Sequence, residues 1–225
     1  MQPMTDLALP ILTAAPAEPG EPAEPAHAGP RPGVVVIHEG MGITPQLIRF
    51  VERVAREGYV VAAPDLFFRV GGPESSDFGT MIGSVTPEQL QRDLATTIAH
   101  LRALGATSIG VTGFCMGGFF TYRAAKWAGE LGVDAAVAFY GGGITRELGD
   151  LACPAILFFG GADPYVPMSD IEVVRAHHGD LVQVYEGADH GFMRDGSDSY
   201  SETAAPDAWA KLLAFFGEHL RGSAR

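Results

Sequence analysis

The sequence predicts an α/β fold, namely one domain with a mainly parallel sheet covered by helices on both faces. From Gly33 onward, short apolar runs alternate with helical patterns, which is the order of elements in a helix-covered parallel sheet. The run VVVIH at 34–38 is continuous and mostly β-branched, as expected for a strand buried on both faces. The length of 225 residues suits a single domain of this kind.

Strands are expected wherever a short apolar run is bounded by turn residues. Six runs meet this description: 34–38, 59–64, 108–114, 135–140, 155–161 and 181–185. Helices are expected between most of them. In parallel sheets of this type, ligands and chemistry gather at the carboxyl ends of the strands. The residues that directly follow these runs are therefore the first candidates for a functional site.

Three helices have clear sequence signals. The first is expected to begin with Thr44 as N-cap and Pro45 in its first turn, and to end at Gly58. The second opens on the capping box Thr86-Pro87-Glu88-Gln89 and stops at Gly105. The third is the C-terminal helix. Their apolar faces are Leu47, Ile48, Val51 and Val54; Leu90, Leu94, Ile98 and Leu101; and Trp209, Leu212, Leu213, Phe216 and Leu220.

The segment before the sheet has a different composition. Residues 14–32 are rich in Pro, Ala and Glu and can bury little, so we interpret them as an exposed connection. The chain thus divides into an N-terminal segment, 1–32, and an α/β domain, 33–225. The apolar stretch near the N-terminus follows Asp6 and has no Lys or Arg before it, which argues against a signal peptide. We expect a cytoplasmic protein whose two cysteines stay thiols.

The charge and hydropathy of the chain exclude several kinds of partner. The net charge is 15 − 27 = −12, which argues against binding to nucleic acid and to anionic membrane surfaces. No apolar run approaches the roughly 20 residues that a membrane-spanning helix requires. The expected partner is a small molecule, and the expected assembly is a monomer or a small homo-oligomer.

The stretch Gly113-Phe114-Cys115-Met116-Gly117 is the most informative motif. It fits the nucleophile-elbow pattern with Cys in place of Ser, at the point where a strand is expected to meet a helix. The turn is sharp enough to require small neighbours, and a helix N-terminus favours the thiolate form of Cys115. The backbone N–H of Met116 would then point at the oxyanion of a tetrahedral intermediate. The sequence predicts Cys115 as a nucleophile and Cys153 as a core thiol.

A thiol nucleophile needs a base, and the base needs an orienting acid. Asp163 follows the apolar run that ends at Gly161, and His190 follows the last predicted strand. The chain order of nucleophile, acid and histidine is that of hydrolases built on an α/β sheet. Asp189 is a rival acid, but adjacent side chains on a tight turn tend to diverge. Cys115, Asp163 and His190 are therefore the predicted triad.

The other histidines are better explained without a catalytic role. His38 closes a strand, where a hydrogen-bonded structural role is expected, and the remaining ones lie in the connection, in helical runs or at a helix end. A zinc site needs three or four converging ligands, and these histidines show no ligand spacing. We expect no metal and no cofactor.

At this point the sequence resembles the dienelactone hydrolase family, whose members are cysteine-dependent α/β-hydrolases. The resemblance runs from about Gly33 to the C-terminal helix. It is most specific in six places: His-Glu-Gly at 38–40, Ala-Pro-Asp-Leu-Phe-Phe-Arg at 63–69, Gly-Phe-Cys-Met-Gly-Gly at 113–118, Phe-Tyr-Gly at 139–141, Asp163, and His-Gly-Phe-Met-Arg at 190–194. It implies a single-domain α/β-hydrolase fold without a cap domain.

The resemblance also implies further site residues. Glu39 matches the family's glutamate, which helps to deprotonate the thiol when substrate arrives. Arg69 and Arg194 match the two arginines that hold the substrate carboxylate, as forked charge-assisted hydrogen bonds allow. Tyr140 matches a tyrosine that lines the pocket, and the N–H of Gly40 would be the second oxyanion donor. The segment 70–85 is expected to border this pocket.

The sequence therefore predicts a hydrolase that opens a small carboxylated lactone or a related ester through a thioester. The resemblance implies maleylacetate as the product from a dienelactone. Two alternatives stay open: a broad carboxylesterase or peptidase acting on neutral substrates, and a catalytically silent member of the fold that binds a small molecule or a partner.

Overall fold

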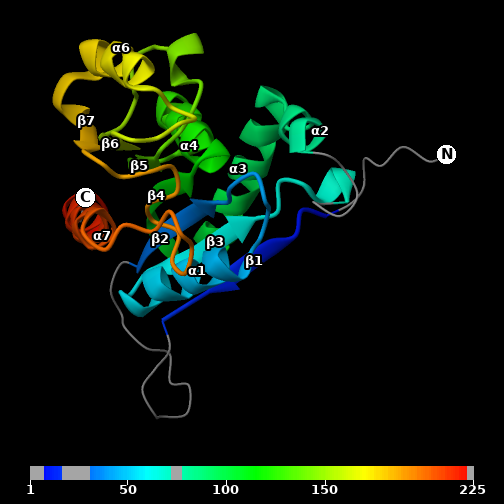
Figure 1. Ribbon diagram of the computed structural model, residues 1–225. Helices are drawn as coiled ribbons and strands as arrows, with labels where there is room; N and C mark the ends of the chain where they lie inside the picture. The colour runs from blue at the N-terminus through cyan, green and yellow to red at the C-terminus, as the bar shows by residue number, and fades with distance from the viewer. Residues whose placement is uncertain (1–7, 17–30, 72–77, 222–225) are drawn as a thin grey trace.

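The computed structural model describes residues 8–16, 31–71 and 78–221, and these residues form one sheet of seven strands (Figure 1). The strand order is β1-β3-β2-β4-β5-β6-β7, and every neighbouring pair is parallel except β1 with β3. The strands are β1 (Ile11–Ala14), β2 (Arg31–Ile37), β3 (Val60–Pro64), β4 (Ala106–Phe114), β5 (Ala135–Phe139), β6 (Ala155–Gly160) and β7 (Val182–Tyr185). The six predicted strands are confirmed to within three residues at each end.

Along the chain, the α-helices alternate with the strands, as the sequence pattern predicts. They are α1 (Pro45–Arg56), α2 (Phe78–Gly83), α3 (Pro87–Ala103), α4 (Met116–Lys126), α5 (Ala128–Leu131), α6 (Met168–His178) and α7 (Ala204–Phe216). Short 3₁₀ turns occur at Phe68–Val70, Ile144–Arg146 and Gly179–Leu181, and a π-helical turn at Gly217–Arg221 extends α7. Of the helices in the described ranges, none combines the length and the apolar character that crossing a membrane requires.

The predicted N-terminal capping residues of α1 and α3 form the expected hydrogen bonds. The Thr44 side chain accepts the N–H of Leu47 at 3.3 Å and so satisfies one of the free donors at the start of α1. At the start of α3, Thr86 and Gln89 bond reciprocally, with N···O distances of 2.9 and 3.3 Å. This is the predicted capping box.

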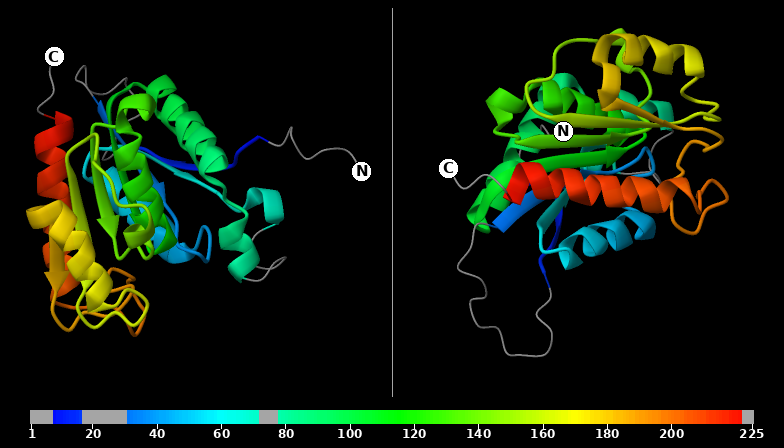
Figure 2. Two further views of the ribbon diagram at one scale, coloured as in Figure 1. Left: turned by 90° about the horizontal axis from the view of Figure 1, so that it is seen from above. Right: turned by 90° about the vertical axis from the view of Figure 1, so that its left-hand side faces the viewer.

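The sheet is covered on both faces (Figure 2). Val34 and Val36 of β2 belong to the cluster that includes α1 and α7, whereas Val35 and Ile37 pack with α3 and α4. All four side chains are fully buried. Because successive residues of a strand point to opposite faces, only a strand covered on both sides can bury four in a row. The continuous apolar run at 34–38 is explained in this way.

The strand β1 was not predicted. It pairs with β3 in antiparallel register, Ile11 opposite Pro64 and Ala14 opposite Val61, and forms the edge of the sheet beside β3. Its four residues include no β-branched run, and Pro10 precedes it directly. Most of the segment predicted as an exposed connection, residues 17–30, lies outside the described residues.

The carboxyl ends of five parallel strands meet at one edge of the sheet. Glu39 follows β2, Cys115 follows β4, Tyr140 follows β5, Asp163 follows β6, and His190 lies beyond β7. Residues that are more than 100 positions apart in the sequence are thus brought to the same edge.

Candidate active site

Cys115 stands at the junction between β4 and α4. Its backbone has φ of 54° and ψ of −116°, and it is one of two non-glycine residues with positive φ in the described ranges. A positive φ is strained for a side chain with a Cβ and persists only where the surrounding structure imposes it. Here the Cys115 N–H donates to the carbonyl of Phe139 at 3.0 Å, and α4 begins at the next residue. The predicted elbow is therefore present.

The glycines of the elbow are required by close backbone contacts. A Cβ on Gly113 would overlap the carbonyl group of Gly117, and a Cβ on Gly117 would overlap the carbonyl oxygen of Ile37 and approach that of His38 to 2.6 Å. Any larger side chain would push α4 away from the ends of β2 and β4. The spacing of glycines around Cys115 is thus explained by the packing of α4 onto the sheet.

The imidazole of His190 is held by Asp163. Its Nδ1 lies 2.7 Å from Oδ2 of Asp163, whose side chain is fully buried. The other carboxylate oxygen accepts the backbone N–H groups of Tyr165 and Val166, at 2.7 and 3.0 Å. The carboxylate of Asp189, the alternative acid of the sequence prediction, instead accepts the backbone N–H of His190. These contacts fix the carboxylate and orient Nε2 of His190 toward the cleft.

The environment of His190 favours its charged form. Burial lowers the pKa of His190, but hydrogen bonding to Asp163 and to Cys115, together with the charges of these groups, outweighs it and raises the pKa to about 9. The rings of Tyr140 and Tyr165 stand edge-on to the imidazole, with centroids at 4.9 and 5.0 Å. Tyr165 was missed by sequence reasoning, although it lies in the same turn as Asp163.

Cys115 and His190 line one cleft of about 1080 Å³. Gly40 and Met116 also line it, and no described residue accepts a hydrogen bond from either backbone N–H. The predicted border segment contributes Ile82, Gly83 and Val85. Much of the remaining lining is apolar: Met41, Phe119, Phe120, Pro164 and Val166. The cleft thus offers a thiol, an imidazole and two free N–H groups in apolar surroundings.

Glu39 and Arg194 form an ion pair at the side of this cleft. Both Nε and one terminal nitrogen of Arg194 lie 2.9 Å from Oε2 of Glu39. Oε1 accepts the hydroxyl of the fully buried Tyr140 at 3.4 Å. Burial, and then the charge of Glu39, raise the pKa of Tyr140, so this hydroxyl stays protonated and donates.

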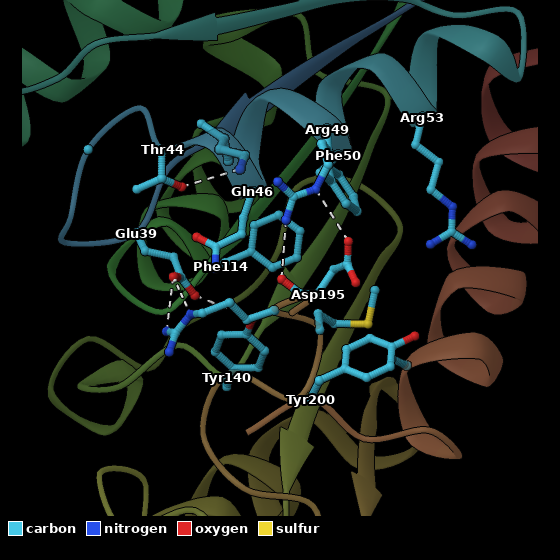
Figure 3. A pocket seen from close by; sticks show the side chains of 15 residues that line it. Glu39, Thr44, Gln46, Arg49, Phe50, Arg53, Phe114, Tyr140, Asp195 and Tyr200 are labelled. Carbon is cyan, nitrogen blue, oxygen red and sulfur yellow. Dashed lines mark hydrogen bonds and ion pairs between the residues drawn. The ribbon is translucent and has the colours of Figure 1, made fainter. Parts of the chain in front are cut away.

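A second cavity of about 260 Å³ (Figure 3) shares Glu39 and Arg194 as walls with the cleft. Tyr140 lines this cavity and not the cleft of Cys115. It lies beside α1 and is lined by Phe50, Phe114 and Tyr200, with Gln46 reaching into it. Cys115 is not among its lining residues. The Glu39–Arg194 pair therefore separates the thiol from this aromatic cavity.

Arg69 is placed away from the predicted constellation. Both of its terminal nitrogens bond to the carboxylate of Asp93 on α3, at 2.7 and 2.6 Å, and Arg69 does not line the cleft of Cys115. Its guanidinium also lies over the ring of Phe68. The structure thus gives Arg69 a carboxylate partner within the fold. Its role in holding a substrate carboxylate stays a prediction, and that role would require Arg69 to leave Asp93.

His38 is fully buried and hydrogen-bonded at both ring nitrogens, which confirms its structural interpretation. Cys115 and Cys153 are both free thiols, and burial raises the pKa of Cys153 to about 12. Arg123, which the sequence analysis did not single out, also lines the cleft and pairs with Glu147.

A sequence model of the dienelactone hydrolase family matches residues 19–220. The chain belongs to the dienelactone hydrolase family. Among relatives of this dienelactone hydrolase family member, proteins named "Putative carboxymethylenebutenolidase" occur in Synechocystis sp. and in Yersinia pestis. The first is 33% identical over 86% of this chain and 88% of that protein, and the second is 31% identical over 86% and 80%.

Solved structures show the same fold. A crystal structure described as "Putative Dienelactone Hydrolase" from Klebsiella pneumoniae subsp. pneumoniae aligns with a TM-score of 0.80 and 29% identity, covering 93% of each chain. A dienelactone hydrolase-like promiscuous phosphotriesterase, P91, aligns with a TM-score of 0.69 and 22% identity, covering 86% of this chain and 88% of that one. The family shows that this protein is a hydrolase of lactones or esters, built as a single-domain α/β-hydrolase.

Proposed function

We propose that this dienelactone hydrolase family member cleaves lactones or esters through a thioester on Cys115. The observation that carries the proposal is the convergence of Cys115 and the His190–Asp163 pair on one cleft. A thiol at a helix N-terminus, beside an imidazole that a buried carboxylate orients, has the geometry of an activated nucleophile.

The reaction has two stages. The thiol proton of Cys115 passes to the neutral form of His190, with Glu39 as a second acceptor in the same cleft, and the sulfur attacks the carbonyl carbon. The N–H groups of Gly40 and Met116 hold the oxyanion. The C–O bond then breaks, His190 protonates the leaving alkoxide, and a thioester remains.

The second stage restores the thiol. Water gives a proton to His190 as its oxygen attacks the thioester carbonyl, and a second oxyanion forms in the same place. The C–S bond breaks, the acid is released, and the proton on His190 returns to the sulfur. No external oxidant, reductant or cofactor enters this balance.

For the substrate we propose a lactone or ester that carries a carboxylate. Two arginines, Arg123 and Arg194, line the cleft, and Arg194 is the one that pairs with Glu39. A substrate carboxylate would compete with Glu39 for the forked hydrogen bonds of Arg194. A small carboxylated lactone of the dienelactone type, opening to maleylacetate, fits this requirement.

A broader esterase activity on neutral substrates is the second candidate. Two observations favour it: the cleft is wide and largely apolar, and Arg69 is engaged by Asp93 instead of facing the cleft. Apolar walls stabilise hydrocarbon parts of a substrate in proportion to the area they cover. One assay on an anionic lactone and a neutral ester separates the two candidates.

The test compares purified wild-type protein with Cys115→Ala, Cys115→Ser and the control Cys153→Ala, on cis- and trans-dienelactone and on 4-nitrophenyl acetate. We expect Cys115→Ala to lose at least about a thousandfold in kcat, as loss of a triad nucleophile does, while Cys153→Ala keeps its activity. Iodoacetamide should label Cys115 first, because burial raises the pKa of Cys153 to about 12. Unchanged turnover by Cys115→Ala would refute the proposal.

A further inference from the structure

His38 uses both ring nitrogens in hydrogen bonds with backbone groups, deep in the sheet at the end of β2. Nε2 accepts the N–H of Leu66 at 3.0 Å, and Nδ1 lies 2.6 Å from the carbonyl oxygen of Glu39. A backbone N–H can only donate and a carbonyl can only accept. The contacts therefore assign the proton of a neutral imidazole to Nδ1 and leave Nε2 as the acceptor.

The neutral form of His38 agrees with its surroundings. The ring is fully buried, and burial lowers the pKa of His38, which opposes the effects of its bond to Glu39 and of the nearby carboxylates of Asp65 and Glu39. Phe67 packs against the ring with a centroid distance of 4.8 Å. One tautomer is thus held in one orientation.

The carbonyl that His38 holds belongs to the peptide whose N–H is that of Gly40. The same oxygen also accepts the N–H of Gly42 at 3.0 Å, so two donors fix its direction. The described residues contain no cis peptide bond. In a trans peptide the N–H and the C=O point in opposite directions. The N–H of Gly40 consequently points away from His38, on the side where Gly40 lines the cleft of Cys115.

We propose that His38 is a positioning residue for catalysis: its Nδ1–H fixes the Glu39–Gly40 peptide so that the Gly40 N–H points at the developing oxyanion. The inference rests on the proposed function, since it names the residue that positions one of the two oxyanion donors of that reaction. The bond from Leu66 has a secondary part, because it ties the far side of the ring to the turn after the neighbouring strand β3 but does not touch the Glu39–Gly40 peptide. The oxyanion donor is thereby attached to the sheet and not only to its own loop.

The two bonds of His38 can be removed one at a time. His38→Asn keeps a side-chain N–H near the position of Nδ1 but does not reach Leu66. His38→Gln keeps an acceptor near the position of Nε2, but its bond to the Glu39 carbonyl is lost. Both variants lose one buried hydrogen bond, so they form a matched pair for stability. His38→Leu removes both bonds.

Two rate measurements distinguish a loss of oxyanion positioning from a general disturbance of the active site. Turnover of 4-nitrophenyl acetate passes through an oxyanion, whereas alkylation of Cys115 by iodoacetamide displaces iodide at a saturated carbon and forms none. We expect His38→Gln to lower kcat tenfold to a hundredfold with KM within threefold of wild type, because loss of a fixed oxyanion donor acts on the transition state. His38→Asn should keep kcat within about threefold of wild type, and the alkylation rate should stay unchanged in both variants.

Thermal unfolding of each variant is measured alongside. Equal loss of kcat in the Asn and Gln variants, an unchanged kcat in His38→Gln, or alkylation that falls together with turnover would each overturn the inference. If His38→Leu does not fold, the Asn and Gln pair still decides. A wild-type protein that alkylates at Cys115 but hydrolyses neither lactones nor esters would instead refute the proposed function.

Discussion

The carboxylate of Glu39 and the guanidinium of Arg194 meet at 2.9 Å on the wall between the Cys115 cleft and the aromatic cavity beside α1. The two side chains are only 15% and 23% exposed, so the pair is poorly screened by solvent. In the proposed mechanism, a substrate carboxylate would compete with Glu39 for the forked hydrogen bonds of Arg194 and would release Glu39 to contact the thiol.

Replacing Arg194 should separate the two substrate classes. Arg194→Met removes the cation that a substrate carboxylate would bind, and we expect kcat/KM for an anionic lactone to fall roughly tenfold to a hundredfold, the equivalent of one hydrogen bond to a charged group. For 4-nitrophenyl acetate, kcat/KM should stay within about threefold of wild type. Arg49→Met is the control, since Arg49 lines the cavity, not the cleft. Equal losses on both substrates would contradict the assignment.

The raised pKa of His190 makes stability depend on pH. Its folded-state pKa of about 9 lies above the ordinary 6.5, so the stabilisation is complete below pH 6.5 and is lost as the pH rises through about 9. The difference corresponds to about 3 kcal/mol of unfolding free energy across this window. Urea denaturation at pH 6 and pH 9.5 should show this loss in wild type and not in His190→Gln.

His178 provides a control for this measurement. Burial, and then the nearby His177, lower the pKa of His178, so its titration falls below the window. His178→Gln should keep the wild-type slope of unfolding free energy between pH 6.5 and 9. A His190→Gln variant with the same slope as wild type would show that the imidazole is not charged in the folded state.

The Arg69–Asp93 pair predicts a stability effect. The Asp93 side chain is 4% exposed and depends on Arg69 for compensation of its charge. Arg69→Met should lower the unfolding free energy by about 3 kcal/mol, as breaking one side of a buried pair does. The double variant Arg69→Met/Asp93→Leu should recover most of this loss. Chemical denaturation provides the measurement.

A surface pair serves as the comparison for Arg69. Arg49→Met breaks an exposed contact with Asp195 and should change the unfolding free energy by at most about 1 kcal/mol. If Arg69→Met instead leaves stability unchanged and raises KM for anionic substrates alone, then Arg69 belongs to substrate binding, as the family resemblance implies.

The elbow glycines should not tolerate a methyl group. In Gly117→Ala the new Cβ would overlap the carbonyl oxygen of Ile37, so we expect loss of folding or a destabilisation above about 3 kcal/mol, the range of severe packing errors. Gly129→Ala in α5 meets no atom within 4 Å and should be neutral or stabilising by up to about 1 kcal/mol. Thermal unfolding compares the two, and a stable Gly117→Ala protein would contradict the described packing.

The parallel part of the fold could be predicted because its signals are local. The apolar run at 34–38 needs cover on two faces, and Thr86 with Gln89 caps a helix through atoms three residues apart. The strand β1 could not be predicted in this way, because its pairing with β3 depends on residues about 50 positions away. Nothing within its own four residues specifies that partner.

The candidate site was predictable where chemistry restricts the residue type. A thiol between glycines and a histidine beyond the last strand leave few alternatives, and the structure brings both to one cleft. The partner of Arg69 was not predictable, because the long side chain of an arginine can pair with many different acidic residues. Only the packing of α3 brings Asp93 to it. The proton on Nδ1 of His38 is likewise assigned only from the two backbone contacts of the ring.

The antiparallel pairing of β1 with β3 has a practical consequence for recombinant work. A truncated chain beginning at Gly33 would keep every residue proposed for catalysis. It would leave the edge of β3 that pairs with β1 without a hydrogen-bonding partner. The bared row of N–H and C=O groups on Val61 to Pro64 would then be a template for a strand from another molecule. A shortened version would be expected to precipitate with an intact active centre, so expression vectors should retain at least residue 8 onward.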